Sequence, residues 1–295
     1  MKADLCIYHG NCADGFTAAW AVRRALGNIK FVPGFYGKDA PEITGKDVLL
    51  VDFSFKRQVL EQMGRMARSV TILDHHKTAQ DDLAAFAIRR AVDAETIDQI
   101  SATPGPWNIR AVFDMNRSGA QITWDFFHPD KFRPKLVDYV ADRDLWQFKL
   151  PKSREIAALI FSYPYDFERW DWIAERMEAD FDGLAAEGAA IERKHFKDID
   201  ELLVQTTREM VIGGQRVKVA NLPYTMSSDA AGMLAEGAPF GACYFDRPDA
   251  RVFSLRSRGD TGADVSEIAA RYGGGGHKNA AGFQVPVGWE GDVAA

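Results

Sequence analysis

The strongest constraint on the fold is an alternation of short apolar runs with helical patterns through the first half of the chain. The apolar runs have the length of strands and lie at 3–10, 29–37, 46–55, 69–76 and 108–115. Segments with helical spacing of apolar residues follow several of them, at 14–27, 57–67 and 119–128. Strands that alternate with helices are typical of a parallel sheet covered by helices on both faces. We therefore expect an α/β domain here.

The pattern changes twice further along the chain. Residues 151–207 are mostly helical in pattern and contain no strand-like run. Residues 208–295 return to strand signals, including a hairpin that turns at Gly213-Gly214. A chain of 295 residues is long enough for two cores. These observations predict a parallel-sheet domain over 1–150, a helical connector over 151–207 and a smaller mixed-sheet α/β domain over 208–295.

The charge balance limits the partners of the protein. The formal net charge is −6 and the sequence pI is about 5.6, which argues against a broad basic surface for long nucleic acids. An anionic substrate would need local basic side chains or bound cations. Three cysteines make no disulfide framework and fit a reducing compartment. The chain has neither a signal-peptide core nor a run of about 20 apolar residues, so we expect a cytoplasmic protein that engages no membrane.

Polar residues that can bind a metal follow three of the predicted strands. His9 ends the first run, Asp52 lies near the end of the third, and Asp74, His75 and His76 end the fourth. The carboxyl ends of parallel strands meet at one edge of a sheet, where ligands bind. Divalent cations such as Mn²⁺ accept imidazole and carboxylate together. The sequence therefore predicts a metal site at this edge, although Asp52 taken alone would also fit a turn.

Two further segments carry acids that can join this site. Asp14 lies in "YHGNCADG" (8–15) ahead of a helix, where it could also be a plain helix N-cap. The run "VADRD" (140–144) offers Asp142 and Asp144, and we place it at another strand end. The order and positions of the four segments predict one shared site.

A glycine run marks the last domain. The sequence "GGGGHKNAAG" (273–282) places four glycines before His277 and Lys278. Consecutive glycines can turn their backbone N–H groups toward an anion and let it approach closely. We interpret the run as a phosphate-binding loop; the alternative is a flexible hairpin loop.

Taken together, "YHGNCADG", "VDFS", "DHH", "VADRD" and "GGGGHKNAAG" resemble the motifs of the DHH phosphoesterase superfamily. More narrowly, they resemble the branch with a C-terminal DHH-associated domain, which includes RecJ-type exonucleases, nano-RNases and pAp phosphatases. The resemblance implies hydrolysis of phosphate esters with two divalent cations, usually Mn²⁺, with Mg²⁺, Co²⁺ or Zn²⁺ as alternatives. The metal ligands that it implies are His9, Asp14, Asp52, Asp74, His75 and Asp142.

The same resemblance implies further roles. It assigns the catalytic positions to Asp52, Asp74 and His76, with His76 near the scissile phosphate. It assigns substrate binding to the second domain, where the implied residues are Arg256, Gly274, Gly275, Gly276 and His277. Two ions about 3.5–4 Å apart could share a water and direct it at phosphorus.

Two positions depart from the family pattern or leave it ambiguous. The first motif commonly carries two aspartates, whereas this chain has Cys12 in place of the first. Cys12 would either supply a thiolate that favours Zn²⁺ over Mn²⁺, or fail to ligate and leave one metal site weaker, and we prefer the second reading. In the fourth motif, Asp142 and Asp144 fit different alignments, and we prefer Asp142.

The function that follows is a metal-dependent phosphodiesterase, of the exonuclease or nano-RNase type, acting on short single-stranded oligonucleotides or nucleotides. The alternatives within this chemistry are a pAp-type phosphatase and a polyphosphate or cyclic-dinucleotide hydrolase. A nucleotide-binding protein without turnover is a different class, motivated by Cys12. A nicotinamide dehydrogenase is disfavoured because the first turn, "GNCADG", lacks the G-x-G-x-x-G pattern. Many relatives dimerise, so a homodimer is a further expectation.

Overall fold

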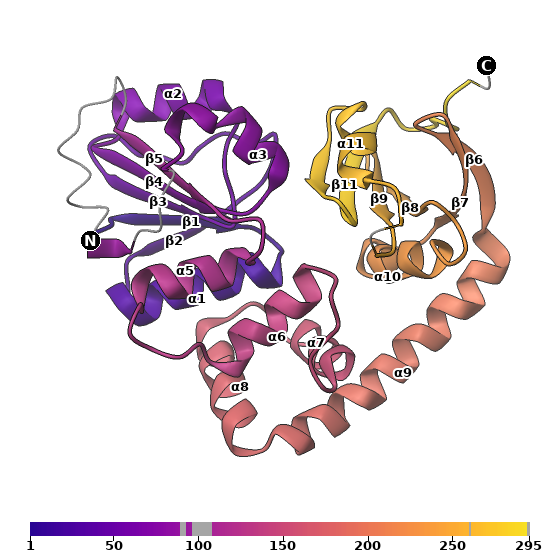
Figure 1. The fold of residues 1–295 in the computed structure, drawn as a ribbon, viewed down its shortest axis with the longest axis horizontal. Coiled ribbons are helices and arrows are strands. Elements are labelled where there is room, and N and C mark those ends of the chain that lie inside the picture. The colour runs from indigo at the N-terminus through magenta and orange to yellow at the C-terminus, as the bar shows by residue number, and fades with distance from the viewer. Residues whose placement is uncertain (89–92, 96–107, 260, 294–295) are drawn as a thin grey trace. The chain divides into compact units, whose positions relative to one another are not determined.

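The computed structural model describes residues 1–88, 93–95, 108–259 and 261–293. The chain forms two compact units, Met1–Ile191 and Glu192–Ala295, and the boundary between them falls inside one long helix. Each unit has its own sheet, drawn in Figure 1, and each is described here by itself. Among the described residues, no helix has both the length and the apolar character needed to cross a bilayer.

The first unit is built on a five-stranded parallel sheet in the order β2-β1-β3-β4-β5. Its strands are β1 (Leu5–His9), β2 (Lys30–Gly34), β3 (Asp47–Val51), β4 (Ser69–Asp74) and β5 (Ile109–Phe113). Helices α1 (Ala13–Leu26) and α5 (Gly119–Phe127) cover one face of the sheet, and α2 (Arg57–Met66) covers the other (Figure 1). Two short turns of helix, α3 (Lys77–Asp82) and η1 (Ala84–Phe86), follow β4. The parallel α/β sheet predicted from the alternation is confirmed.

The strands are apolar along their length because both faces of the sheet are covered. Alternate side chains of β3 belong to different cores. Leu49 and Val51 pack on the side of α1 and α5, whereas Val48 and Leu50 pack on the side of α2. All four are at most 2% exposed. Charged groups inside such a strand would lose their hydration, so the strand ends are the places where the sheet can carry them.

Four helices complete the first unit and lead out of it. They are α6 (Lys135–Asp144), α7 (Ser153–Phe161), α8 (Phe167–Ala179) and α9 (Phe181–Thr206). Helix α8 packs against α1, where the indole N–H of Trp170 donates to Thr17 Oγ1 at 2.9 Å and that of Trp20 donates to Asp171 Oδ1 at 2.8 Å. The helical character predicted over 151–207 is confirmed, and the domain limits at 150 and 207 stay predictions.

The run "VADRD" lies at the end of a helix, so its predicted place at a strand end was wrong. It forms the last turn of α6. Val137, Val140 and Ala141 are buried at the i, i+3 and i+4 positions of that helix. This is helical rather than strand spacing.

The second unit has a six-stranded mixed sheet in the order β10-β11-β9-β8-β7-β6. The strands are β6 (Arg208–Ile212), β7 (Gln215–Asn221), β8 (Gly241–Asp246), β9 (Arg251–Arg256), β10 (Gly275–His277) and β11 (Ala280–Val285). Helices α10 (Tyr224–Leu234) and α11 (Val265–Ala270) complete it. Gly213 and Gly214 have φ of 61° and 77°, the positive values that a two-residue type I′ hairpin turn requires. The predicted hairpin and mixed sheet are confirmed.

Candidate metal centre

The predicted ligands of the first unit come together at the carboxyl edge of its sheet. His9 ends β1, Asp52 follows β3, and Asp74 ends β4. Asp14 joins them from the first turn of α1. The edge is therefore where the parallel topology brings together residues that lie far apart in the sequence.

Asp52 lies at the centre of this group. Its side chain is 1% exposed, its Oδ1 lies 3.0 Å from His75 Nε2, and its Oδ2 lies 3.4 Å from His9 Nδ1. The residue has φ of 53°, a left-handed conformation that Asp and Asn adopt more readily than other non-glycine residues. Its N–H donates to Leu73 O at 2.8 Å, which ties it to β4. The local backbone thus turns this carboxylate toward both histidines.

Asp14 is held by the start of α5. Its carboxylate accepts the backbone N–H of Gly119 at 2.7 Å and that of Ala120 at 3.1 Å, and the positive end of the helix dipole favours a carboxylate there. Ser118 begins the helix as the N-cap of a capping box with Gln121. Sequence analysis missed this contact, although the pattern Ser-x-x-Gln does mark the helix start.

Gly119 is a second residue that sequence analysis missed. A methyl group on Gly119 would lie 2.4 Å from Cβ of Asp52, and real contacts are never that short. Only glycine therefore lets α5 approach close enough to hold Asp14 beside Asp52.

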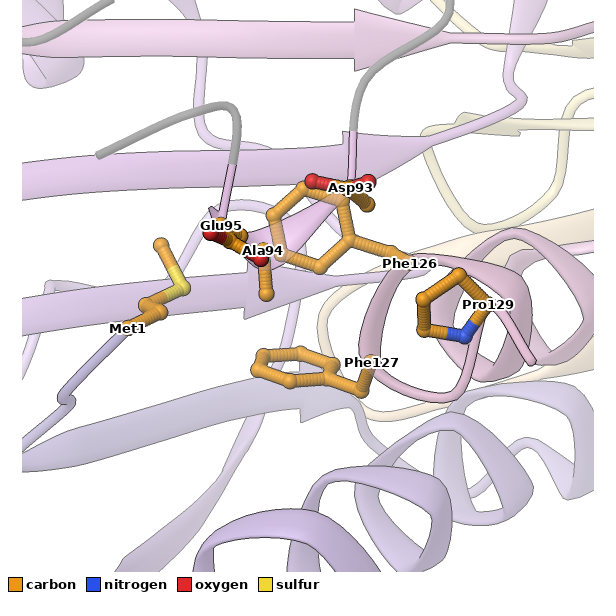
Figure 2. A pocket seen from close by; sticks show the side chains of 7 residues that line it. All are labelled: Met1, Asp93, Ala94, Glu95, Phe126, Phe127 and Pro129. Carbon is orange, nitrogen blue, oxygen red and sulfur yellow. The ribbon is translucent and has the colours of Figure 1, made fainter. Parts of the chain in front are cut away.

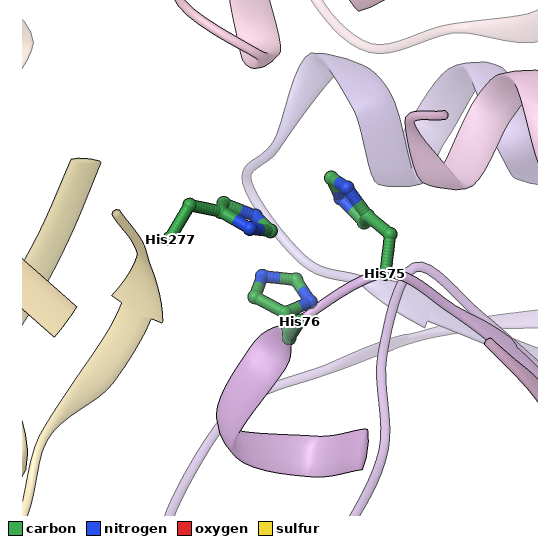
Figure 3. A group of neighbouring side chains, drawn as sticks. All are labelled: His75, His76 and His277. Atoms are coloured by element: carbon green, nitrogen blue, oxygen red, sulfur yellow. The ribbon is translucent and has the colours of Figure 1, made fainter. Parts of the chain in front are cut away.

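The DHH triplet forms a compact hydrogen-bonded turn. Asp74 Oδ1 accepts the backbone N–H of His75 at 2.7 Å and that of His76 at 3.2 Å, and it lies 2.7 Å from His76 Nδ1. Figure 3 draws the two imidazoles where the chain leaves β4 and enters α3; the third ring in that view, His277, belongs to β10 of the second unit. The Asp74 carboxylate therefore fixes the orientation of His76.

Burial and mutual repulsion set the charges of the acids. Burial, with the negative charge of Asp52 next, raises the pKa of Asp14 well above its usual range. Burial also raises the pKa of Asp144, although the nearby His75 opposes this shift. Burial opposes ionisation of Asp52 too, but its hydrogen bond with His75 and the nearby His9 imidazole outweigh burial and hold the pKa of Asp52 well below its usual range.

The histidines respond in the opposite sense. Burial lowers the pKa of His75, but its hydrogen bond with Asp52 and the charges of Asp144, Asp52 and Asp14 outweigh burial and raise the pKa to about 10. Asp74 likewise outweighs burial and raises the pKa of His76. The cluster therefore favours positive charge strongly, and the same negative surroundings would stabilise a bound metal cation.

The donor set fits divalent metal ions. Among the described residues of the first unit, three groups have ligand atoms within 4.8 Å of one another: His9, Cys12 and Asp52; Asp14, Asp52 and His75; and Asp52, Asp74 and His76. Oδ2 of Asp52 and Oδ2 of Asp74 are buried and accept no hydrogen bond from any described residue. Buried carboxylate oxygens of this kind are costly unless a cation or donor satisfies them.

Comparisons with known proteins give the chain a relative and a fold. No protein-family model matches the chain. The chain is 30% identical to "Uncharacterized protein R106" of Acanthamoeba polyphaga mimivirus, an alignment that covers 96% of this chain and 67% of R106. The chain belongs to the same family as R106.

Among solved structures, the chain is similar to the DHH domain of a member of the s1p family of ribosomal proteins, with a TM-score of 0.51, 13% identity and coverage of 94% of this chain and 81% of that chain. It also matches PggH, a pGpG-specific phosphodiesterase from Vibrio cholerae, with a TM-score of 0.49, 13% identity and coverage of 97% and 94%. The chain has the DHH-domain fold.

Of the two acids in the fourth motif, Asp144 is the one that lies beside His75, whereas Asp142 was the preferred ligand. The carboxylate of Asp142 accepts the backbone N–H groups of Lys149 at 2.9 Å and Leu150 at 3.1 Å, so it orders the loop after α6. Oδ2 of Asp144 lies 3.5 Å from His75 Nε2 and is buried without a hydrogen bond from any described residue. We therefore replace Asp142 by Asp144 in the candidate site.

The predicted substrate residues of the second unit lie at one end of its sheet. Arg256 ends β9 and donates to Ser228 Oγ at 2.7 Å and to Leu255 O at 2.8 Å. Part of the glycine run is not a loop but strand β10, which pairs with β11. A Cβ on Gly274 would lie 2.1 Å from Gly282 O, so this glycine is required by packing. The binding roles of Gly274, Gly275, Gly276, His277 and Arg256 stay predictions.

A separate cavity lies away from the cluster. Its volume is about 560 Å³, and Figure 2 shows its lining of Met1, Asp93, Ala94, Glu95, Phe126, Phe127 and Pro129. It contains none of the predicted site residues. The candidate site is therefore identified by its ligand chemistry and not by this cavity.

Proposed function

We propose that this DHH-domain protein is a divalent-metal-dependent phosphoesterase that hydrolyses phosphate ester bonds of short single-stranded oligonucleotides or nucleotides. The observation that carries the proposal is the position of Asp52, which offers an oxygen to all three candidate ligand groups of the first unit. A carboxylate shared between adjacent groups is suited to bridge two ions. The resemblance of the motifs to those of DHH phosphoesterases supports a phosphate ester as substrate.

The ligand sets follow from the distances. One ion would be held by Asp14, Asp52 and His75, with Asp144 beside His75, and the other by His9 and Asp52. Mn²⁺ suits such carboxylate and imidazole ligands, as do Mg²⁺ and Co²⁺ to different degrees. When bound, two such ions lower the pKa of a shared water and neutralise the oxygens of the phosphate.

The Asp74–His76 pair supplies a positioned proton. Asp74 Oδ1 holds His76 Nδ1 at 2.7 Å and is itself held by two backbone N–H groups. Burial opposes the charged form of His76, but the charge of Asp74 and its hydrogen bond outweigh burial and raise the pKa of His76, which favours the protonated imidazole. A protonated imidazole here can stabilise a phosphate oxygen or protonate the departing group.

Two features favour a short substrate: the negative net charge of the chain and the residues around Arg256 in the second unit. A chain with a net charge of −6 would repel a long polyanion except where local positive charge holds it. Arg256 is held in one orientation by Ser228 and Leu255, and the neighbouring strand β10 is rich in glycine. Gripping the terminal phosphate of a short substrate is the role that we propose for these residues.

The test is a hydrolysis panel with Mn²⁺. Its substrates are 5′-labelled and 3′-labelled RNA and DNA of two to about twenty residues, together with pAp, a cyclic dinucleotide and polyphosphate. Asp52→Asn is the informative variant because Asn also tolerates the positive φ, so only the charge is removed. Asp74→Ala removes the acid that orients His76. Asp182→Asn is the control, since this side chain is 88% exposed on α9.

We expect wild type and Asp182→Asn to release mononucleotides, and Asp52→Asn and Asp74→Ala to lose activity by at least about 10²-fold. The label position gives the polarity of attack. Preference for pAp, polyphosphate or a cyclic dinucleotide would assign the corresponding alternative. Equal inactivity of wild type and variants with Mn²⁺, Mg²⁺, Co²⁺ and Zn²⁺ would overturn the proposal.

A further inference from the structure

Formation of helix α1 does not explain why a cysteine stands at position 12. It is the N-cap of α1, with extended backbone at φ −128° and ψ 131°. Ser, Thr, Asp and Asn are the residues preferred at this position. The only other cysteines, Cys6 and Cys243, are fully buried in hydrophobic clusters, whereas Cys12 is half-buried. Its residue type therefore calls for an explanation beyond packing.

The neighbours of Cys12 supply that explanation. The thiol sulfur lies within 4.8 Å of ligand atoms of both His9 and Asp52. His9 Nδ1 and Asp52 Oδ2 are 3.4 Å apart, are buried and have no hydrogen-bond partner among the described residues. Asp52 is 1% exposed. The two residues that carry these buried atoms without hydrogen bonds are thus the two that share a ligand group with the Cys12 sulfur.

The spacing is close to that of a metal site. A tetrahedral ion with bonds of about 2.0 to 2.3 Å separates its ligand atoms by about 3.3 to 3.8 Å. The pair His9–Asp52 already has this separation. The Cys12 sulfur lies within 4.8 Å of both residues, so about 1 Å of movement would bring it to the same separation.

We propose that Cys12 is a thiolate ligand in a site with His9 and Asp52, and that this site selects Zn²⁺ or Co²⁺ over Mn²⁺. Sulfur, imidazole and carboxylate together are ligands of zinc, whereas the adjacent set of Asp14, Asp52 and His75 contains only oxygen and nitrogen and suits Mn²⁺. The two ions would therefore differ in kind. Binding at the Cys12 site replaces the thiol proton, so each ion releases one proton there.

The proposal rests on the metal centre of the proposed function but not on turnover, and its test reads metal–sulfur bonding directly. Chelator-treated protein is titrated with Co²⁺ while the thiolate-to-cobalt charge-transfer band is followed in the near ultraviolet. We expect the band in wild type, its loss in Cys12→Ser, and its retention in Cys243→Ala, a cysteine control in the second unit. Co²⁺ binding without the band in wild type, or an undiminished band in Cys12→Ser, would overturn the proposal.

Two further measurements remain informative if Cys12→Ser folds poorly. In wild type, Zn²⁺ should slow alkylation of Cys12, located by peptide mass spectrometry, and Mn²⁺ should protect it less; equal alkylation with and without bound Zn²⁺ would contradict ligation. Cys12→Asp should lower the ratio of Zn²⁺ to Mn²⁺ affinity by at least about tenfold, and an unchanged ratio would count against the selectivity. A charge-transfer band in a protein inactive on the whole panel would overturn the proposed function alone, whereas hydrolysis without the band would overturn only the role of Cys12.

Discussion

Replacing Gly119 with alanine should disturb two acids of the metal centre at once. The added methyl carbon would lie 2.4 Å from Cβ of Asp52 and 2.8 Å from its Oδ1. Favourable contacts between such atoms are about 3.5 to 4 Å, so Asp52 and α5 must separate by about 1 Å. The N–H of Gly119 also donates to Asp14 Oδ2 at 2.7 Å, so the same shift would displace Asp14.

The expected magnitude follows from this clash. Overpacking a well-packed core typically costs about 1–3 kcal/mol, and we expect that loss in the free energy of unfolding measured with urea. Displaced support around metal ligands typically costs about 10- to 100-fold in affinity, which isothermal titration with Mn²⁺ would measure.

The control for that experiment is Gly237→Ala. Gly237 has φ of 68° and no atom within 4 Å of an added methyl group, so alanine there costs about 1–2 kcal/mol of backbone strain in the other unit. Its Mn²⁺ affinity should equal that of wild type. If Gly119→Ala also bound Mn²⁺ as tightly as wild type, the close approach of α5 would not be what positions Asp14 and Asp52.

Three further predictions concern the same site. Asp144→Asn should weaken Mn²⁺ binding in calorimetry with little change in stability, whereas Asp142→Asn should lower the urea midpoint and keep the affinity; the reverse pattern would restore Asp142 as the ligand. Mn²⁺ at a hundred times its dissociation constant should stabilise the chelator-treated protein by about 2.7 kcal/mol, or about 5 to 10 °C in scanning calorimetry, and no shift would argue against a metal site. The pKa of His75 is about 10 in the folded protein, against an ordinary value of 6.5. Its contribution to the stability of the metal-free protein is therefore complete below pH 6.5 and is lost as the pH rises through 10. The raised pKa values of Asp14 and Asp144 change the stability in the same direction, and a metal-free protein more stable at pH 9 than at pH 6 would contradict this.

The sheet and its strand-end ligands could be predicted from the sequence because they depend on local pattern. The segment "SVTILDHH" gives a buried strand and its polar end in one run, and β4 ends at Asp74. Once the strands are parallel, their carboxyl ends must share an edge. The sequence therefore predicts that His9, Asp52 and the DHH triplet lie together.

The choice between Asp142 and Asp144 could not be made from the sequence because it depends on the face of α6. Residues two apart on a helix differ by about 200° in direction, so they cannot both face the same site. The loop after α6 distinguishes them, because the backbone N–H groups of Lys149 and Leu150 donate to the Asp142 carboxylate. A strand end, where the sequence pattern placed this motif, does not have the helical geometry on which the choice depends.

The hydrogen-bond donors to Asp14 could not be predicted from the sequence for a different reason. Its two hydrogen-bond donors, Gly119 and Ala120, lie more than 100 positions away in the sequence, and no local pattern links them. Their contact also explains how four acids can coexist at one buried edge. The N-terminus of α5 compensates part of the charge of Asp14, His75 compensates part of that of Asp52, and backbone N–H groups hold Asp74. One carboxylate oxygen on each of Asp52, Asp74 and Asp144 still has no hydrogen bond from a described residue. A protonated histidine compensates only part of this negative charge, whereas a divalent cation could compensate more of it.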